Sequence, residues 1–297
     1  MPILLTFDVE DWFQVENFKE YISYDSWPAR ELRVEKNTHA LLDLLDEASK
    51  RRGAGREVKA TFFVLGWIAE RCPGLVVEIS RRGHEVASHG YWHHLCYDQA
   101  VSELHDDLLR SKEVLEKIIG AEVLGYRAPS FSINDQVLQV IREAGFLYDS
   151  SYNSFDGHGR YGALTIPADQ QRSAPFYTFT GPFYEIPVSN ISWGKKVIPW
   201  AGGGYFRLLP SSIHRGGVAR VLAEKGCFTF YMHPWEIDPG QPRVKEAKAS
   251  FRLRHYVNLG RARKKLAGLI SAFEQQEFVS CFDYVKSGPD VAASELK

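Results

Sequence analysis

The sequence predicts an α/β protein built on a parallel sheet, either a barrel or a doubly wound sheet. Strand-like and helix-like segments alternate through most of the 297 residues, which is the pattern of repeated strand–helix–strand units. A chain of this length fits a single α/β barrel domain. Hydrophobic residues make up 44% of the chain and charged residues 25%, an ordinary balance for a globular protein with a substantial core.

The expected strands are short apolar runs, and the expected helices carry apolar residues at helical spacing. Gly120, Gly145 and Gly226 are placed to end three of the helices. The polar stretch 151–182 is interpreted as a long insertion of the kind that often contacts substrate. In chain order, the expected strands cover 3–8, 60–65, 85–88, 123–126, 146–148, 184–188, 227–232 and 278–282, and the expected helices cover 37–52, 74–82, 99–119, 135–144, 210–224 and 261–273.

The composition argues against several classes of protein. With 36 basic and 37 acidic residues the net charge is −1, so we expect no general attraction to nucleic acid or to anionic membranes. The sequence contains no run of eighteen apolar residues, so we expect no transmembrane helix. The first residues do not resemble a signal peptide. The cysteines form no CxxC pair, and we interpret them as reduced thiols in a cytoplasmic protein. They are Cys72, Cys96, Cys227 and Cys281.

Three carboxylates, Asp8, Glu10 and Asp11, follow the first expected strand within four residues. Uncompensated carboxylates at the rim of a barrel repel one another and lose hydration, and a nearby cation would relieve this. The alternative interpretation is a solvated loop whose acids cap the following helix.

The spacing of His89 and His93 is typical of two ligands for one metal ion. If the segment forms a helical turn, both imidazoles lie on one face. Together with a carboxylate they predict a two-histidine, one-carboxylate site, which suits Zn²⁺ and also Co²⁺, Fe²⁺ or Ni²⁺. The alternative is a pair of structural histidines.

Arg127 and His233 also follow expected strands. An arginine at a strand end can hold a carboxylate in its ionised form, and a histidine in this position is a candidate proton donor. Alone, each is more often a surface arginine or a core histidine. Because the reactive face of an α/β barrel lies at the carboxyl ends of its strands, the clusters together predict an active site.

These clusters resemble the motifs of the polysaccharide deacetylase family, also called the NodB-homology family or carbohydrate esterase family 4. Thr6–Asp11 resembles its Thr-Phe-Asp-Asp-Gly motif and His89–His93 its His-x-x-x-His motif, while Arg127–Pro129 and Phe230–His233 resemble later motifs. The longer strings, such as Met232–Glu236, resemble a branch associated with exopolysaccharide and PEP-CTERM gene clusters. The resemblance implies a distorted (β/α) barrel of about seven parallel strands and a bound divalent metal, most often Zn²⁺. It also implies hydrolysis of N-acetyl groups on an N-acetylated carbohydrate, either an exopolysaccharide or its precursor, with release of acetate.

The resemblance also implies roles for individual residues. Asp8 would be the general base, oriented by Arg127, and His233 would be the general acid. His89 and His93 would be two of the metal ligands.

Two positions depart from the family pattern. Val9 stands where the family has a metal-binding Asp, so the third ligand would be Glu10 or Asp11. We prefer Glu10, because side chains two apart on an extended strand share a face, provided the strand continues past Asp8. The family often has an acid that tunes the catalytic histidine, and Asp149 is the nearest candidate for it.

We expect residues 1–285 to form a single deacetylase domain, with a C-terminal extension from about residue 239 and a flexible tail at 286–297. The basic run 252–265 is expected to be a solvated helix face, with binding of an anionic carrier as the alternative. Two other functions remain open: an allantoinase-like amide hydrolase of the same superfamily, and a catalytically inactive carbohydrate-binding barrel. The sequence carries no signal for an oligomeric state.

Overall fold

The computed structural model describes residues 1–155, 157, 159, 161–166, 177–179, 182–194 and 196–288. For 177–179 it describes the backbone alone. Most of the second half of the expected insertion at 151–182 lies outside the described residues. The expected tail at 286–297 is described only as far as residue 288.

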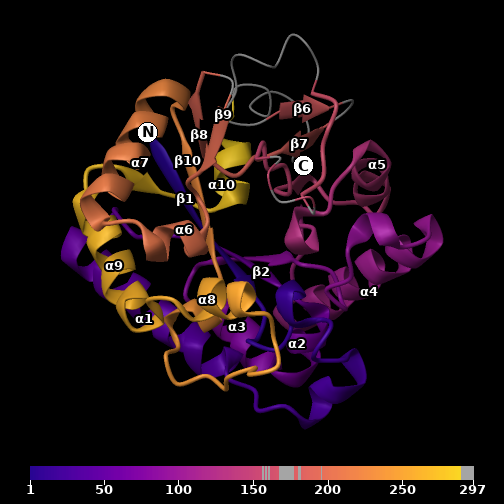
Figure 1. Cartoon of the computed structure of the whole chain (residues 1–297). Helices are drawn as coiled ribbons and strands as arrows, with labels where there is room; N and C mark the ends of the chain where they lie inside the picture. The colour runs from indigo at the N-terminus through magenta and orange to yellow at the C-terminus, as the bar shows by residue number, and fades with distance from the viewer. Residues whose placement is uncertain are drawn as a thin grey trace.

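Seven parallel strands form the centre of the molecule as a curled half-barrel (Figure 1). This confirms the barrel-like α/β fold that the resemblance implied. At the β7 edge of the sheet, β6 (Tyr177–Phe179) runs antiparallel to β7. Elsewhere, β11 (Glu277–Phe278) pairs in parallel with the start of β1. The seven strands lie in the order β10 (Phe228–Met232), β1 (Pro2–Val9), β2 (Thr61–Val64), β3 (Glu85–Ser88), β4 (Gly125–Tyr126), β5 (Tyr148–Asp149) and β7 (Phe183–Glu185).

Strand β1 is an interior strand of the sheet, because it pairs with β10 on one side and β2 on the other. All its residues from Ile3 to Val9 are buried, as expected for a parallel strand covered on both faces. Phe7 pairs with Met232, and Asp8 pairs with Phe63. The register therefore brings the carboxyl ends of these strands, and the residues that follow them, to one edge of the sheet.

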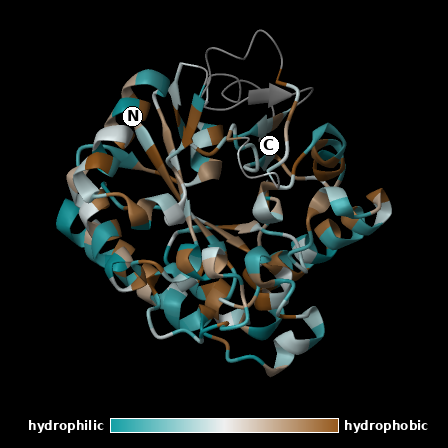
Figure 2. Ribbon diagram, viewed as in Figure 1, coloured by the Kyte–Doolittle hydropathy of each residue, from teal (hydrophilic) through white to brown (hydrophobic). Residues whose placement is uncertain are grey.

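Helices surround the outside of the sheet (Figure 1), and Figure 2 shows hydrophobic residues concentrated on the strands and hydrophilic residues on the outward helix faces. Gly120 and Gly226 end α4 and α7 in the left-handed conformation, which glycine adopts without a steric penalty. The helices are α1 (Val34–Arg52), α2 (Gly66–Arg71), α3 (Pro73–Arg81), α4 (Val101–Ile119), α5 (Asp135–Glu143), α6 (Gly203–Leu208), α7 (Ser211–Lys225), α8 (Ala249–Tyr256), α9 (Leu259–Ala272) and α10 (Cys281–Lys286), with 3₁₀ turns at Glu16–Phe18, Tyr24–Ala29, Cys96–Asp98, Pro129–Phe131 and Pro234–Ile237.

The end of the chain differs from the expected strand at 278–282. Only Glu277–Phe278 is extended, and α10 follows. The reason is a local cap, because the Ser280 side chain accepts a hydrogen bond from the backbone N–H of Asp283 at 3.0 Å. The hairpin of β8 (Asn190–Trp193) and β9 (Lys196–Pro199) was not predicted.

The four cysteines are all buried, and none is in a disulfide, in agreement with the expected thiols. Among the described helices, none combines the length and the apolar character that a bilayer-spanning helix requires.

Candidate active site

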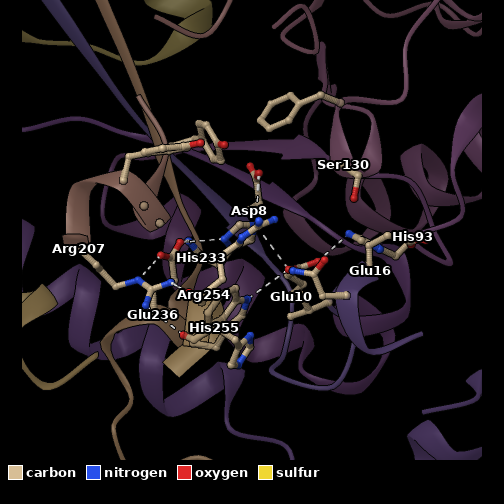
Figure 3. Close-up of a pocket in the computed structure, with 18 of the residues that line it drawn as sticks. Asp8, Glu10, Glu16, His93, Ser130, Arg207, His233, Glu236, Arg254 and His255 are labelled. Atoms are coloured by element: carbon tan, nitrogen blue, oxygen red, sulfur yellow. Dashed lines mark hydrogen bonds and ion pairs between the residues drawn. The ribbon is translucent and has the colours of Figure 1, made fainter. Parts of the chain in front are cut away.

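A cavity of about 370 Å³ opens at the carboxyl ends of β1, β3 and β10. Five of the residues that the sequence singled out line it, and Figure 3 shows part of this cluster. These five residues are Asp8, Glu10, His89, His93 and His233. Side chains separated by more than 200 positions in the sequence are therefore brought to one site by the register of the strands.

Asp8 is held by a buried arginine at the end of β4. Arg127 donates from Nη1 to Oδ1 of Asp8 at 2.8 Å and to the Thr6 hydroxyl at 2.7 Å. Its other nitrogens donate to the backbone carbonyl and the hydroxyl of Ser150. Arg127 is completely buried, so its position is set by these bonds. They orient one oxygen of Asp8 and leave Oδ2 toward the cavity.

Glu10, His89 and His93 form a compact group of potential metal ligands. One ligand atom from each lies within 4.8 Å of the others, and all three residues are buried. Nδ1 of His89 is bonded to the carbonyl oxygen of Arg127 at 2.7 Å, which leaves Nε2 available, as is usual for a metal-binding histidine. Burial lowers the pKa of His89 to about 4, so its ring is neutral at pH 7, the form that binds metals.

The segment that carries the two histidines is a loop and not the helical turn considered from the sequence. Gly90 has φ 75° and His93 has φ 60°, and two left-handed residues so close together are incompatible with a helix. Asp107 on α4 holds the loop by accepting from the backbone N–H groups of Tyr91 and Trp92. The rings of His89 and His93 still lie close together, edge to face, with centroids 5.3 Å apart.

Glu10 lies just beyond the end of β1, and its backbone N–H bonds back to the carbonyl of Asp8 at 3.0 Å. Its carboxylate approaches Nε2 of His93 at 2.6 Å and Nε2 of His233 at 3.5 Å. Burial acts to raise the pKa of Glu10, but the neighbouring histidines together lower it to about 2.

Asp11 points away from this group, and both its oxygens are occupied. Oδ1 accepts from the N–H of Trp12 at 2.8 Å, while Oδ2 accepts from the N–H groups of Arg33 and Val34 at 2.6 and 2.8 Å. These last two donors lie at the N-terminus of α1, which has no cap from its own side chains. Asp11 therefore serves as a cap for α1 from a distant part of the chain.

His233 lies directly after β10, facing Asp8 and Glu10. Its Nε2 is 3.9 Å from Oδ2 of Asp8. Its Nδ1 is 2.9 Å from Oε1 of Glu236, and the same oxygen accepts the backbone N–H of His233 at 3.0 Å. Burial acts to lower the pKa of His233, but the surrounding carboxylates raise it to about 9.

Glu236 is in turn paired with a second buried arginine. Arg207 on α6 donates from Nε to Oε2 of Glu236 at 2.7 Å. Its remaining nitrogens donate to the backbone carbonyls of Arg254, His255 and Val257. This chain of contacts runs from His233 to the end of α8 and fixes one ring nitrogen of His233, leaving the other toward Asp8.

The acid that contacts His233 is Glu236 and not Asp149, which the sequence suggested for this role. Asp149 accepts from the hydroxyl of Ser151 at 2.6 Å and lies against Glu185. Burial and the neighbouring Asp149 raise the pKa of Glu185 well above its usual range. Glu236 was missed although it lies three residues after His233, at capping-box spacing.

Backbone strain concentrates around the cavity. Ser130 and Phe131, which line it, have φ angles of 53° and 58°. Such conformations are uncommon for residues other than glycine and cluster at functional sites. Phe131, Tyr231 and Trp235 give the cavity aromatic walls, and the ring of His233 stacks on Trp235 at 5.1 Å. Flat apolar surfaces beside charged groups are suited to binding a sugar ring.

Comparisons with known families divide the chain into two parts. Residues 3–148 match the family described as polysaccharide deacetylase. Residues 150–283 match a family described as a domain of unknown function, DUF3473. The first match contains Asp8, His89, His93 and Arg127, and the second contains His233.

Two relatives each match less than half of the chain. A peptidoglycan-N-acetylglucosamine deacetylase of Bacillus cereus is 34% identical over 90 residues, which cover 30% of this chain and 42% of that protein. A peptidoglycan deacetylase-like protein of Gibberella zeae is 30% identical over 129 residues, which cover 43% of this chain and 36% of that protein. The matches thus span less than half of either relative.

A solved structure from Mycobacterium smegmatis, described as that of a polysaccharide deacetylase, has the same fold. It aligns with a TM-score of 0.58 at 21% sequence identity, covering 96% of this chain and 88% of that one. The similarity of fold therefore extends over both parts of the chain.

Proposed function

We propose that the protein is a metal-dependent hydrolase that removes N-acetyl groups from a carbohydrate and releases acetate, because residues 3–148 match the polysaccharide deacetylase family. One observation carries the proposal: the group of Glu10, His89 and His93 shares a cavity with the Arg127-bound carboxylate of Asp8 and with His233. This is the set of groups that metal-assisted amide hydrolysis needs.

In this proposal Glu10, His89 and His93 hold a divalent cation, most often Zn²⁺. Two imidazoles and one carboxylate in a buried group leave coordination positions open, as catalytic zinc sites do. The buried Glu10 carboxylate lies 2.6 Å from Nε2 of His93, and ligand atoms of all three residues lie within 4.8 Å of one another, which supports the choice. Asp11 is not included, since backbone N–H groups occupy both its oxygens. A bound cation would supply Lewis-acid chemistry, by lowering the pKa of water and polarising a carbonyl group.

Asp8 is the proposed general base. Its Oδ2 faces the cavity, and Arg127 holds the carboxylate in place through Oδ1 at 2.8 Å. It takes a proton from water as the water oxygen bonds to the acetyl carbon. His233 lies across the cavity, and its Nε2 gives a proton to the nitrogen as the C–N bond breaks. The products are acetate and an amino sugar.

Glu236 is a positioning residue for His233 in this scheme. By accepting from Nδ1 it directs Nε2 toward the cavity, and Arg207 keeps Glu236 ionised and in place. The arrangement follows the acid–histidine pairing that orients a catalytic imidazole in other hydrolases.

We further infer that the substrate is an exopolysaccharide or its precursor and that deacetylation occurs in the cytoplasm. The first inference rests on the strings, such as Met232–Glu236, that resemble the exopolysaccharide-associated branch. The second is supported by four buried cysteines without disulfides. We also propose that the single catalytic domain runs to about residue 285, because β10 and β11, from the second part, both pair with β1.

The direct test is acetate release from a panel of N-acetylated oligosaccharides, using chelator-treated protein before and after addition of Zn²⁺. We expect no release before the addition, restored release after it, and one bound metal per chain by elemental analysis. Turnover of a small ureide without metal would instead support an allantoinase-like enzyme. Binding of sugar and metal without acetate release would establish an inactive carbohydrate-binding barrel.

A further inference from the structure

A second cavity, of about 760 Å³, lies beside the candidate active site. It is bounded by α6, α7 and α9, which lie together on the left of Figure 1, and α9 contacts both α6 and α7. Arg207 and Leu208 at the end of α6 line both cavities, so the two share a wall there. All the residues that line it fall within the part of the chain whose family has no known function.

Among the described residues, no carboxylate side chain lines this cavity. The ionisable side chains that line it are those of the basic residues Arg207, Arg215, Arg261, Lys264 and Lys265, with one histidine, His214. We call the space the cationic cavity. Five basic side chains without an acid are unusual in a chain whose net charge is −1, because like charges repel and are normally interspersed with acids.

Three of these cations have no partner within the described part of the chain. Arg207 is paired with Glu236, and Lys265 donates to the backbone carbonyls of Phe206 and Leu209. No ion pair or hydrogen bond of the side chains of Arg215, Arg261 and Lys264 occurs among the described residues. Their charge is therefore available to a ligand.

Two helix N-termini add to the positive potential. Ser211 begins α7 and Leu259 begins α9, and neither first turn has an acidic residue or a capping side chain. Pro210, Ser211, Asn258 and Gly260 line the cavity, so both ends border it. Uncapped N–H groups at a helix N-terminus favour an anion, and here they coincide with unpaired guanidinium and ammonium groups.

We propose that the cationic cavity binds a phosphate-type oxyanion carried by the substrate, while the N-acetyl sugar lies in the adjacent catalytic cavity. Arg215 and Arg261 can present planar donor pairs to phosphate oxygens, and Lys264 adds a mobile point charge. The shared wall at Leu208 puts the two sites next to each other. The link to the substrate rests on the proposed function, whereas the anion site itself does not.

The test uses the full chain and two double variants. Arg261→Ala with Lys264→Ala removes two exposed, unpaired cations of the cavity. Lys117→Ala with Lys286→Ala removes two exposed cations from α4 and α10, on other parts of the surface, and serves as the charge-matched control. Circular dichroism and thermal unfolding establish that both variants fold.

The first measurement is calorimetric binding of pyrophosphate at low salt. We expect the wild type and the control to bind equally and the cavity variant to bind about tenfold more weakly or worse. The anion site is overturned if the wild-type protein binds no pyrophosphate, or if the cavity variant binds it as tightly as the control variant does. If the wild-type protein binds pyrophosphate but releases no acetate from any sugar, the proposed function is refuted and the anion site is retained.

The second measurement separates a phosphate of the substrate from free phosphate. Acetate release is compared for N-acetylglucosamine and N-acetylglucosamine 1-phosphate. We expect a lower KM for the phosphorylated sugar, raised about tenfold in the cavity variant alone, with KM for the neutral sugar unchanged. If pyrophosphate binds but the two sugars show the same KM in every variant, the anion is a separate ligand, and its assignment to the substrate is overturned.

Discussion

The two sides of the candidate active site are built differently. The part of the chain before β5 contributes Asp8, Glu10, His89 and His93, all less than 5% exposed. The later part contributes His233, whose side chain is 21% exposed. The groups proposed to bind metal and to take a proton are thus enclosed, whereas the proposed proton donor lies nearer to solvent. The two sides meet because β10 pairs with β1.

The two sides also differ in how their key groups are held. Arg127 donates to Asp8, to Thr6 within the same strand and to Ser150 directly after β5. His233 is held by Glu236, which depends on Arg207 and through it on the carbonyls that end α8. The comparison indicates that the site is incomplete without the second part of the chain.

The largest losses of activity are expected for substitutions of His89 and His233, and the two variants should differ in whether they still bind metal. Substitution His89→Ala should abolish activity and empty the metal site, because one of three ligands is lost. Substitution His233→Ala should lower kcat by about 10²- to 10⁴-fold, the usual contribution of a general acid, with metal retained. Elemental analysis and acetate release on the same preparations check both outcomes. A full metal complement in His89→Ala would break the comparison.

A smaller effect is expected at the contact that holds His233. Glu236→Gln should lower kcat by roughly 10- to 1,000-fold with little change in KM, since the imidazole loses its charged partner. Glu236→Asp retains the charge and should recover part of the activity. Steady-state kinetics on folded protein provide the measurement.

The matched control for Glu236 is Glu224→Gln, because Glu224 pairs with Arg220 on the exposed face of α7. That variant should keep wild-type kinetics. Equal kcat in the Glu236 and Glu224 variants would show that Glu236 has no positioning role.

The smallest effect on activity is expected at Asp11. Asp11→Ala should lower the free energy of unfolding by roughly 2–4 kcal/mol, because three backbone N–H groups lose a charged acceptor, while metal binding persists. Glu10→Ala should instead remove the metal. Denaturant unfolding with metal analysis distinguishes them, and metal loss in Asp11→Ala would reverse the proposed ligand choice.

Local sequence was sufficient to place most strands and the residues that follow them. The apolar runs at 3–8 and 227–232 correspond closely to β1 and β10, because burial on both faces leaves a continuous hydrophobic signal. The position of Asp8 and His233 at the ends of these runs could therefore be predicted. The helical turn considered for His89–His93 could not be rejected from the sequence, because the loop that replaces it is held at Tyr91 and Trp92 by Asp107 on another element.

Only the tertiary structure decided which charged groups meet. Glu236 is near His233 in the sequence, but its pairing with Arg207 spans 29 residues, and no local pattern encodes it. The basic run 252–265 was expected to be one helix face, yet the chain breaks between α8 and α9 at Val257 and Asn258. Arg261 and Lys264 consequently join Arg215 of α7 around the cationic cavity. Hydrophobic periodicity acts over a few residues and can be read along the chain, whereas ionic contacts depend on which strand and helix ends the fold brings together.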